Sequence, residues 1–356
     1  MAITASQVKE LREMTGAGMM ECKKALTECD GDMDAAVEAL RKSGAAKAEK
    51  KASRIAAEGI AKVAVDGNTA VVVEVNSETD FVAKNDTFQD FVQEVANKAL
   101  ASSVDKADGA DVPKILGVED ELVEKIATIG EKLSIRRFEK VTAETVVSYI
   151  HGGGRIGVLV AANGDSSDAA KEALTNIAMQ VAAMNPTYVS RDEMSQAELD
   201  KLREITVDSA LNDPFSLPKP ILQGLLDKAV NDKVWSDDEI AIYEEKKSNM
   251  NYLPNFLSAE SKAQLAELAM ADKASIVENK IFNGLVEGRV SKQLKDICLL
   301  DQVYVKAEDG KQTVGKYLAS VNKDLAVAKF VRFEVGEGME KKNEDFAAEV
   351  AAQMGN

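Results

Sequence analysis

The chain offers few side chains that could carry out covalent chemistry. Histidine occurs once, at His151, so a Ser-His-Asp relay could use only this residue, and a multi-histidine metal site is excluded. The three cysteines, Cys22, Cys29 and Cys298, form no C-x-x-C pair. Their odd number and their spacing argue against a disulfide framework and against a thiolate zinc site, and they fit a reducing cytosol. The sequence therefore predicts no catalytic residue, no metal site and no cofactor.

The loop at residues 76–85 places a large aromatic side chain beside a carboxylate, at Phe81 and Asp80. An apolar strand precedes this loop and a helix follows it. Such a pair can fill an apolar pocket of a partner protein while its carboxylate disturbs charges nearby. The alternative is that Phe81 packs under its own helix beside Phe88, with Asp80 as a turn residue. Residue chemistry alone favours this packing.

Two other segments could bind ligands. A glycine-rich run followed by a cation, from His151 to Arg155, could cradle phosphate. No phosphate-binding motif is completed there and a strand follows, so a hairpin turn is the better interpretation. The segment 333–338 contains two glutamates, but without further ligands it is interpreted as a solvated turn.

Arg12, Met19 and Met20 form a candidate contact surface near the N-terminus. Methionine is soft and adaptable at binding surfaces. Two adjacent methionines on a helix cannot both face one core, so at least one of them is expected to be exposed.

The composition limits the class of partner. The chain has 356 residues, which suits about two or three domains, and a formal net charge of −16. Such a charge argues against nucleic acid as the main partner and against a broad contact with an anionic membrane. The sequence shows no basic start followed by an apolar stretch and no run of 18 apolar residues, which predicts a cytoplasmic protein without a secretory signal or membrane span.

The elements that position these residues predict an α+β fold. Residues 1–44 are expected to form a domain of three short helices, the last ending at Gly44, with a helical linker at 45–58. The order strand, strand, helix, helix, strand follows at 59–141. A similar order recurs at 142–186 together with 297–338, so a duplicated core of two subdomains with small antiparallel sheets is predicted.

Residues 187–296 interrupt the second subdomain and are strongly helical. Helical character extends over 192–211, 219–231, 237–248 and 259–296. Two long helices separated by shorter ones favour an inserted antiparallel coiled-coil arm with extra helices at its tip. Residues 339–356 are expected to form a C-terminal helical module that includes Phe346.

Five segments together resemble the elongation factor Ts family. They are LREMTGAGMMECKKAL at 11–26, EVNSETDFVAKND at 74–86, YIHGGGRIGVLVA at 149–161, NIAMQVAAMNP at 176–186 and RFEVGEGMEKKNEDFAAEVAAQ at 332–353. The resemblance implies a three-helix N-terminal domain of the ubiquitin-associated type, a two-subdomain core and a coiled-coil arm. It implies a translation elongation factor that binds elongation factor Tu and promotes the release of GDP, without covalent chemistry.

The resemblance also implies roles for individual positions. Thr79, Asp80, Phe81 and Val82 match the segment that enters elongation factor Tu beside its magnesium site. The resemblance further assigns partner contacts to residues in three other regions, namely Arg12, Met19, Met20, His151 and Phe346. A homodimer through the core or the inserted arm is a further implied partner. The insert is longer than the usual arm, and we expect its added helices not to touch the exchange site.

The two predicted subdomains differ at the position of Asp80 and Phe81. The matching loop of the second copy, residues 163–166, has no aromatic residue. A feature of one copy only is not explained by the shared fold, so this difference favours function over packing. The alternatives are a helical binding scaffold without exchange activity and an enzyme that uses His151 and Arg155 on phosphorylated substrates.

Overall fold

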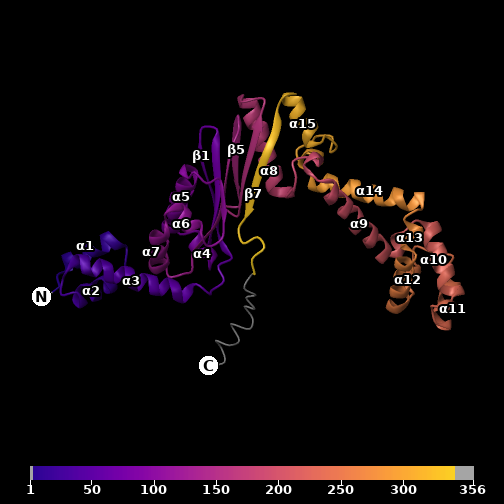
Figure 1. Cartoon of the computed structure of the whole chain (residues 1–356), viewed down its shortest axis with the longest axis horizontal. Helices are drawn as coiled ribbons and strands as arrows, with labels where there is room; N and C mark the ends of the chain where they lie inside the picture. The colour runs from indigo at the N-terminus through magenta and orange to yellow at the C-terminus, as the bar shows by residue number, and fades with distance from the viewer. Residues whose placement is uncertain (1–2, 341–356) are drawn as a thin grey trace. The chain divides into compact units, whose positions relative to one another are not determined.

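The computed structural model describes residues 3–340 (Figure 1). Its first three helices are α1 (Ala5–Thr15), α2 (Met19–Glu28) and α3 (Met33–Lys51). They form a small bundle around a core that includes Leu11, Cys22 and Leu26. A capping box at Thr4 begins α1, because its hydroxyl accepts from the Gln7 backbone amide and its own amide donates to the Gln7 side chain.

The predicted end of the third helix at Gly44 is wrong, because α3 continues to Lys51. Gly44 is buried against α7 (Glu119–Ile129), where a β-carbon would lie 3.4 Å from that of Ala127 and 3.7 Å from Val123. A β-carbon at this position would make ordinary van der Waals contacts with α7, and Gly44 lies within a continuous helix that it does not terminate.

The first sheet has four antiparallel strands in the order β1-β2-β4-β3. They are β1 (Glu58–Asp66), β2 (Thr69–Ser77), β3 (Lys106–Asp108) and β4 (Ser134–Thr142). The helices of this region are α4 (Asp80–Ala83), α5 (Asp86–Ala101), α6 (Val112–Leu116) and α7. The sequence missed β3, because three exposed or half-buried residues leave no apolar alternation to detect.

The second sheet has three antiparallel strands in the order β5-β6-β7. They are β5 (Thr145–His151), β6 (Ile156–Asn163) and β7 (Ala326–Glu334), and the accompanying helices are α8 (Asp168–Met184) and α15 (Val314–Val321). Both sheets repeat one arrangement, in which a hairpin is followed by a helix and the last strand pairs with the second. The α+β class with small antiparallel sheets is confirmed.

Strand β2 is buried on both faces, which explains its nearly continuous apolar sequence. One face, including Val71 and Val73, packs with Phe88 and Phe91 of α5. The other face, including Val72, packs with residues of the second sheet such as Leu159. The side chains on this second face of β2 therefore form an apolar layer between the two sheets.

Residues 186–303 form a second compact unit made of helices. Its elements are η1 (Arg191–Glu193), α9 (Gln196–Asn212), η2 (Pro214–Ser216), α10 (Lys219–Asn231), α11 (Asp237–Lys246), η3 (Leu253–Asn255), α12 (Ala259–Ala271), α13 (Lys273–Ile276), α14 (Lys280–Ile297) and η4 (Leu299–Asp301). They enclose their own core, which includes Leu226, Trp235 and Phe282. Helical structure at the predicted positions is thereby confirmed.

Residues 259–296, which the sequence predicted as helical, are divided among α12, α13 and α14. The chain bends at Asp272, whose carboxylate accepts from Lys228 at 2.8 Å, and a new helix begins where Asn279 caps Ile281. Among residues 3–340, no helix combines the length and the apolar character that a membrane span requires.

Candidate functional site

The segment after β2 presents Asp80 and Phe81 to solvent. Phe81 is 80% exposed, and the Asp80 side chain is 54% exposed. Phe88, by contrast, is completely buried in the core beneath α5. The alternative in which Phe81 packs beside Phe88 is therefore wrong.

Residues 80–83 form the short helix α4, where the sequence predicted only a loop. Thr79 caps it, because its hydroxyl accepts from the Val82 amide at 3.4 Å. Val82 is half-buried against the first core and Ala83 is buried. This single turn therefore directs Val82 and Ala83 inward and Asp80 and Phe81 outward. Figure 1 shows α4 at the lower end of the first sheet.

A carboxylate from a distant loop holds the start of α4. Oε2 of Glu131 accepts from the backbone amides of Glu78 at 3.1 Å and Thr79 at 3.0 Å. Its Oε1 accepts from the Thr79 hydroxyl at 2.7 Å. In return, the Glu78 carboxylate accepts from the Lys132 amide at 2.6 Å and from Arg54 at 3.2 Å. We call these paired contacts between residues 78–79 and 131–132 the carboxylate clasp.

Sequence reasoning missed the carboxylate clasp because Glu131 lies 52 residues from Thr79. The available signal was Gly130, which ends α7 in the left-handed region at φ 87°. A carboxylate directly after such a turn leaves the helix axis and is free to cap another element. The sequence cannot show which element it caps.

Asp80 forms an ion pair with Lys84, four residues further along, with 2.7 Å between Oδ2 and Nζ. The hydrogen bond from Lys84 lowers the pKa of Asp80, so the carboxylate is ionised at neutral pH. Both side chains are more than half exposed, and such pairs contribute little to stability. A partner protein can therefore separate Asp80 from Lys84 at small cost.

The glycine-rich run is a hairpin turn between β5 and β6, as predicted. Gly152, Gly153 and Gly154 all have positive φ values, of 59°, 66° and 102°. His151 is exposed at the end of β5, and its Nδ1 shares a hydrogen bond of 3.0 Å with the Tyr149 hydroxyl.

Contacts between the two sheets bring the His151 hairpin to the same end of the core as α4. The Ala61 amide of β1 donates to the Gly154 carbonyl at 2.7 Å, and Arg155 pairs with Glu58 of β1 at 3.5 Å. Glu58 in turn lies opposite Ser77, just before the segment that leads into α4. Two of the predicted contact regions are thus neighbours through β1.

Arg12, Met19 and Met20 are all exposed on the N-terminal bundle. Arg12 lies in the last turn of α1, while Met19 and Met20 begin α2 and are 60% and 76% exposed. The prediction of at least one exposed methionine is therefore confirmed for both. Within residues 3–340, no hydrogen bond or ion pair joins these side chains to Thr79–Val82. Phe346 lies outside the described residues.

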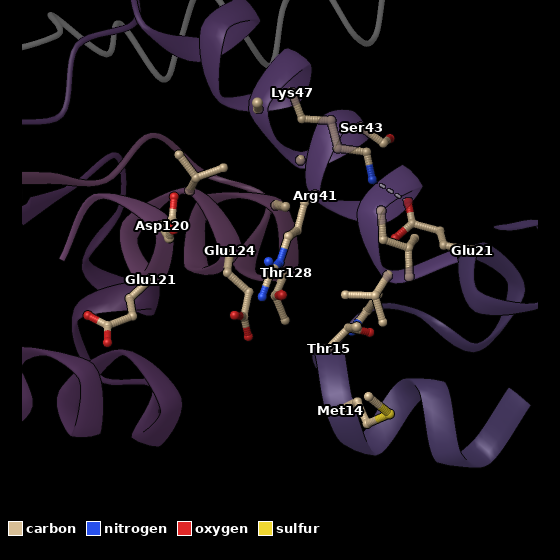
Figure 2. Close-up of a pocket in the computed structure, with 17 residues that line it drawn as sticks. Met14, Thr15, Glu21, Arg41, Ser43, Lys47, Asp120, Glu121, Glu124 and Thr128 are labelled. Atoms are coloured by element: carbon tan, nitrogen blue, oxygen red, sulfur yellow. Dashed lines mark hydrogen bonds and ion pairs between the residues drawn. The ribbon is translucent and has the colours of Figure 1, made fainter. Parts of the chain in front are cut away.

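A pocket of about 330 Å³ lies between the N-terminal bundle and α7 (Figure 2). Its apolar lining includes Val37 and Val123, and its charged lining includes Arg41 and Glu124. Lys47 forms an ion pair with Glu21 there, and its hydrogen bond lowers the pKa of the glutamate. The lining of the pocket carries charged groups of both signs. The pocket lies where α3 packs beside α7.

The turn after β7 is only partly solvated, which corrects the interpretation of residues 333–338. Gly336 is buried, and its amide donates to the Glu74 carboxylate at 2.9 Å. Glu337 is exposed and pairs with Arg137 at 3.2 Å. Across residues 3–340, no group of three or more His, Cys, Asp or Glu side chains is arranged to hold a metal ion.

Comparison with known protein families gives one match that covers more than half of the chain. The model described as Elongation factor TS matches residues 78–337. The matched region includes the carboxylate clasp, α4, the His151 hairpin and the helical unit at 186–303. The chain therefore belongs to the elongation factor Ts family of translation elongation factors.

Proposed function

We propose that the protein binds GDP-loaded elongation factor Tu and accelerates GDP release by inserting Asp80 and Phe81 beside the magnesium and phosphate site. The observation that carries this proposal is the exposure of Phe81, whose side chain is 80% exposed. It lies on a helical turn that Thr79 caps and that the Glu131 carboxylate holds by hydrogen bonds. A large aromatic side chain on a fixed support loses little conformational entropy when it enters a pocket. Membership of the family supplies the identity of the partner.

The proposed exchange works by thermodynamic linkage. A factor that binds the nucleotide-free partner more tightly than the GDP form must weaken GDP binding by the same coupling free energy. Displacing magnesium removes a large positive charge that neutralises the phosphates of GDP and helps to hold them. Neither step requires an acid, a base or a nucleophile from this chain, so we propose an exchange factor that performs no covalent chemistry.

The four residues from Thr79 to Val82 are suited to different roles in the proposed contact. Asp80 and Phe81 are exposed and suited to direct contact with the partner. The Thr79 hydroxyl is already bound to Glu131 and Val82, and the Val82 side chain packs into the first core. Thr79 and Val82 therefore support the tip, whereas Asp80 and Phe81 form it.

Other surfaces extend the proposed contact. His151 lies at the same end of the core as α4, and Arg12, Met19 and Met20 offer an exposed, adaptable patch on the N-terminal bundle. We place Phe346 among the contacts on the resemblance alone. Action in the cytoplasm, a homodimer and the absence of nucleic acid or membrane partners remain predictions.

The release of fluorescent GDP from purified elongation factor Tu tests the proposal. We expect Phe81→Ala to slow factor-stimulated release by roughly 30-fold or more, the effect of an interface anchor worth about 2 kcal/mol. The matched control is Ile115→Ala, which removes an exposed apolar side chain from α6 of the same subdomain.

The same assay separates the alternatives. Wild-type rates from a correctly folded Phe81→Ala protein would refute the role of Phe81. A scaffold without exchange activity would leave GDP release unchanged even in the wild type. An enzyme that depends on His151 would show substrate turnover that His151→Ala abolishes.

A further inference from the structure

We propose that Glu131 is a positioning residue of the exchange site, which fixes the direction in which Asp80 and Phe81 are presented. The inference rests on the proposed function of Asp80 and Phe81. Glu131 acts through the backbone of Glu78 and Thr79 and does not need to touch the partner itself.

The first support is that three hydrogen bonds converge on one carboxylate. Two consecutive backbone amides, of Glu78 and Thr79, donate to Oε2 of Glu131, while the Thr79 hydroxyl donates to Oε1. Hydrogen bonds to an ionised acceptor are stronger and shorter than neutral ones. Both oxygens of the half-buried Glu131 carboxylate are therefore engaged within the chain.

The second support is where these bonds lie along the chain. Thr79 is the N-cap of α4, and its hydroxyl holds both Glu131 and the Val82 amide. The Ser77 hydroxyl also donates to the Thr79 carbonyl, at 2.9 Å. Because α4 is only one turn long, it cannot orient itself by its own hydrogen bonds. The direction of Phe81 therefore depends on the residue that precedes the turn.

The third support is the reciprocity of the carboxylate clasp. Glu78 accepts from the Lys132 amide at 2.6 Å, so each of the two loops supplies one carboxylate to the backbone of the other. Lys132 Nζ also donates to the Arg54 carbonyl at 2.7 Å, and the Arg54 side chain pairs with Glu78. The tip is thus connected to the segment that follows α3 of the N-terminal bundle.

The test compares GDP release for the wild type, Glu131→Ala, Phe81→Ala and the double variant, with full-length protein and purified elongation factor Tu. We expect Glu131→Ala to lower the maximal rate by ~10- to 100-fold, the cost of misplacing a reacting or displacing group by about 1 Å. The factor concentration that gives half of this rate is expected to change by less than ~3-fold, because the wider contact surface is intact. In the Phe81→Ala background, Glu131→Ala should have almost no further effect.

Two variants control for general damage to the fold. Glu121→Ala removes a carboxylate that pairs with Lys98 at 2.8 Å, in the same subdomain but away from α4, and should leave the rate unchanged. Glu131→Gln keeps one oxygen that both backbone amides can use and should restore most of the rate. A Gln variant as slow as the Ala variant would contradict positioning by these hydrogen bonds.

Amide hydrogen exchange provides a readout that does not depend on the partner. Loss of the Glu131 carboxylate should speed exchange at the Glu78 and Thr79 amides and leave the β2 amides unchanged. Unchanged exchange at both amides would overturn the inference.

The GDP-release rates of the variants distinguish the positioning role of Glu131 from the proposed function of Asp80 and Phe81. Slow release with Phe81→Ala and normal release with Glu131→Ala would overturn the positioning role and leave the proposed function standing. Equal effects of Glu131→Ala with and without Phe81 would also overturn it, because Glu131 would then act elsewhere. Normal release with Phe81→Ala would overturn the proposed function itself.

Discussion

Glu74 on β2 and Arg137 on β4 form an ion pair with 2.6 Å between Oε2 and Nε, in which the Glu74 side chain is completely buried. Oε1 of the same carboxylate accepts from Arg136 at 3.0 Å and from the Gly336 amide at 2.9 Å. Gly336 belongs to the turn that follows β7 of the second sheet. One buried carboxylate therefore fastens the end of the second sheet to the first.

Removing this carboxylate should destabilise the core strongly. Glu74→Ala leaves the two arginines without their buried partner, and the expected loss in the free energy of unfolding is about 3–5 kcal/mol. Urea unfolding followed by circular dichroism measures it. The control is Glu337→Ala, which removes a 43% exposed partner of Arg137 and should cost about 1 kcal/mol or less. Equal losses for the two variants would show that burial of Glu74 is not what matters.

The stability of the core should fall in acid partly through Glu139. Burial raises the pKa of Glu139, but hydrogen bonds from Lys329 and Lys106 outweigh it and leave the pKa below its ordinary value of 4.5. Because the folded pKa is the lower one, Glu139 contributes its full stability above pH 4.5 and loses it as pH falls through the folded pKa.

Replacement by glutamine tests this assignment. Glu139→Gln should lower the free energy of unfolding at pH 7 and make its decline below pH 4.5 shallower. Denaturant unfolding at a series of pH values measures both effects. Glu308→Gln, at an exposed position, should retain the wild-type pH profile. An equally steep decline in the Glu139→Gln protein would assign the acid sensitivity to other carboxylates.

The helical unit at 186–303 should be separable in stability from the exchange site. Trp235 is 2% exposed, and its indole N–H donates to the Ser261 carbonyl at 2.9 Å. Trp235→Ala should therefore destabilise this unit by about 3–5 kcal/mol. GDP release from elongation factor Tu should stay within ~2-fold of wild type, because Trp235 lies in a separate compact unit with its own core.

Hydrogen exchange within residues 186–303 measures the loss of stability, and the fluorescent GDP assay measures the function. Tyr252→Ala, which removes a 60% exposed side chain from the same unit, is the control and should alter neither. A large loss of stimulated GDP release in the Trp235→Ala protein would show that this unit contributes to the exchange site.

The sequence by itself determined the α+β class, the helical insert and most strand positions, because these follow from local periodicity and capping. The continuous apolar run of β2 and the capping box at Thr4 are examples. The glycine-rich run was also assigned correctly as a hairpin turn, since a strand follows it. Local signals failed at Gly44, which was expected to end a helix but lies within α3 where that helix runs beside α7.

For the candidate site, the sequence supplied Asp80 and Phe81 but left packing and exposure open. Tertiary structure decided the question, because the core beneath α5 is filled by Phe88 and Phe91, whereas Phe81 remains exposed. Only the fold could reveal Glu131, since the hydrogen bonds to Thr79 join residues 52 positions apart. Periodicity reports which face of an element is buried, whereas a contact between two loops depends on how the elements between them pack.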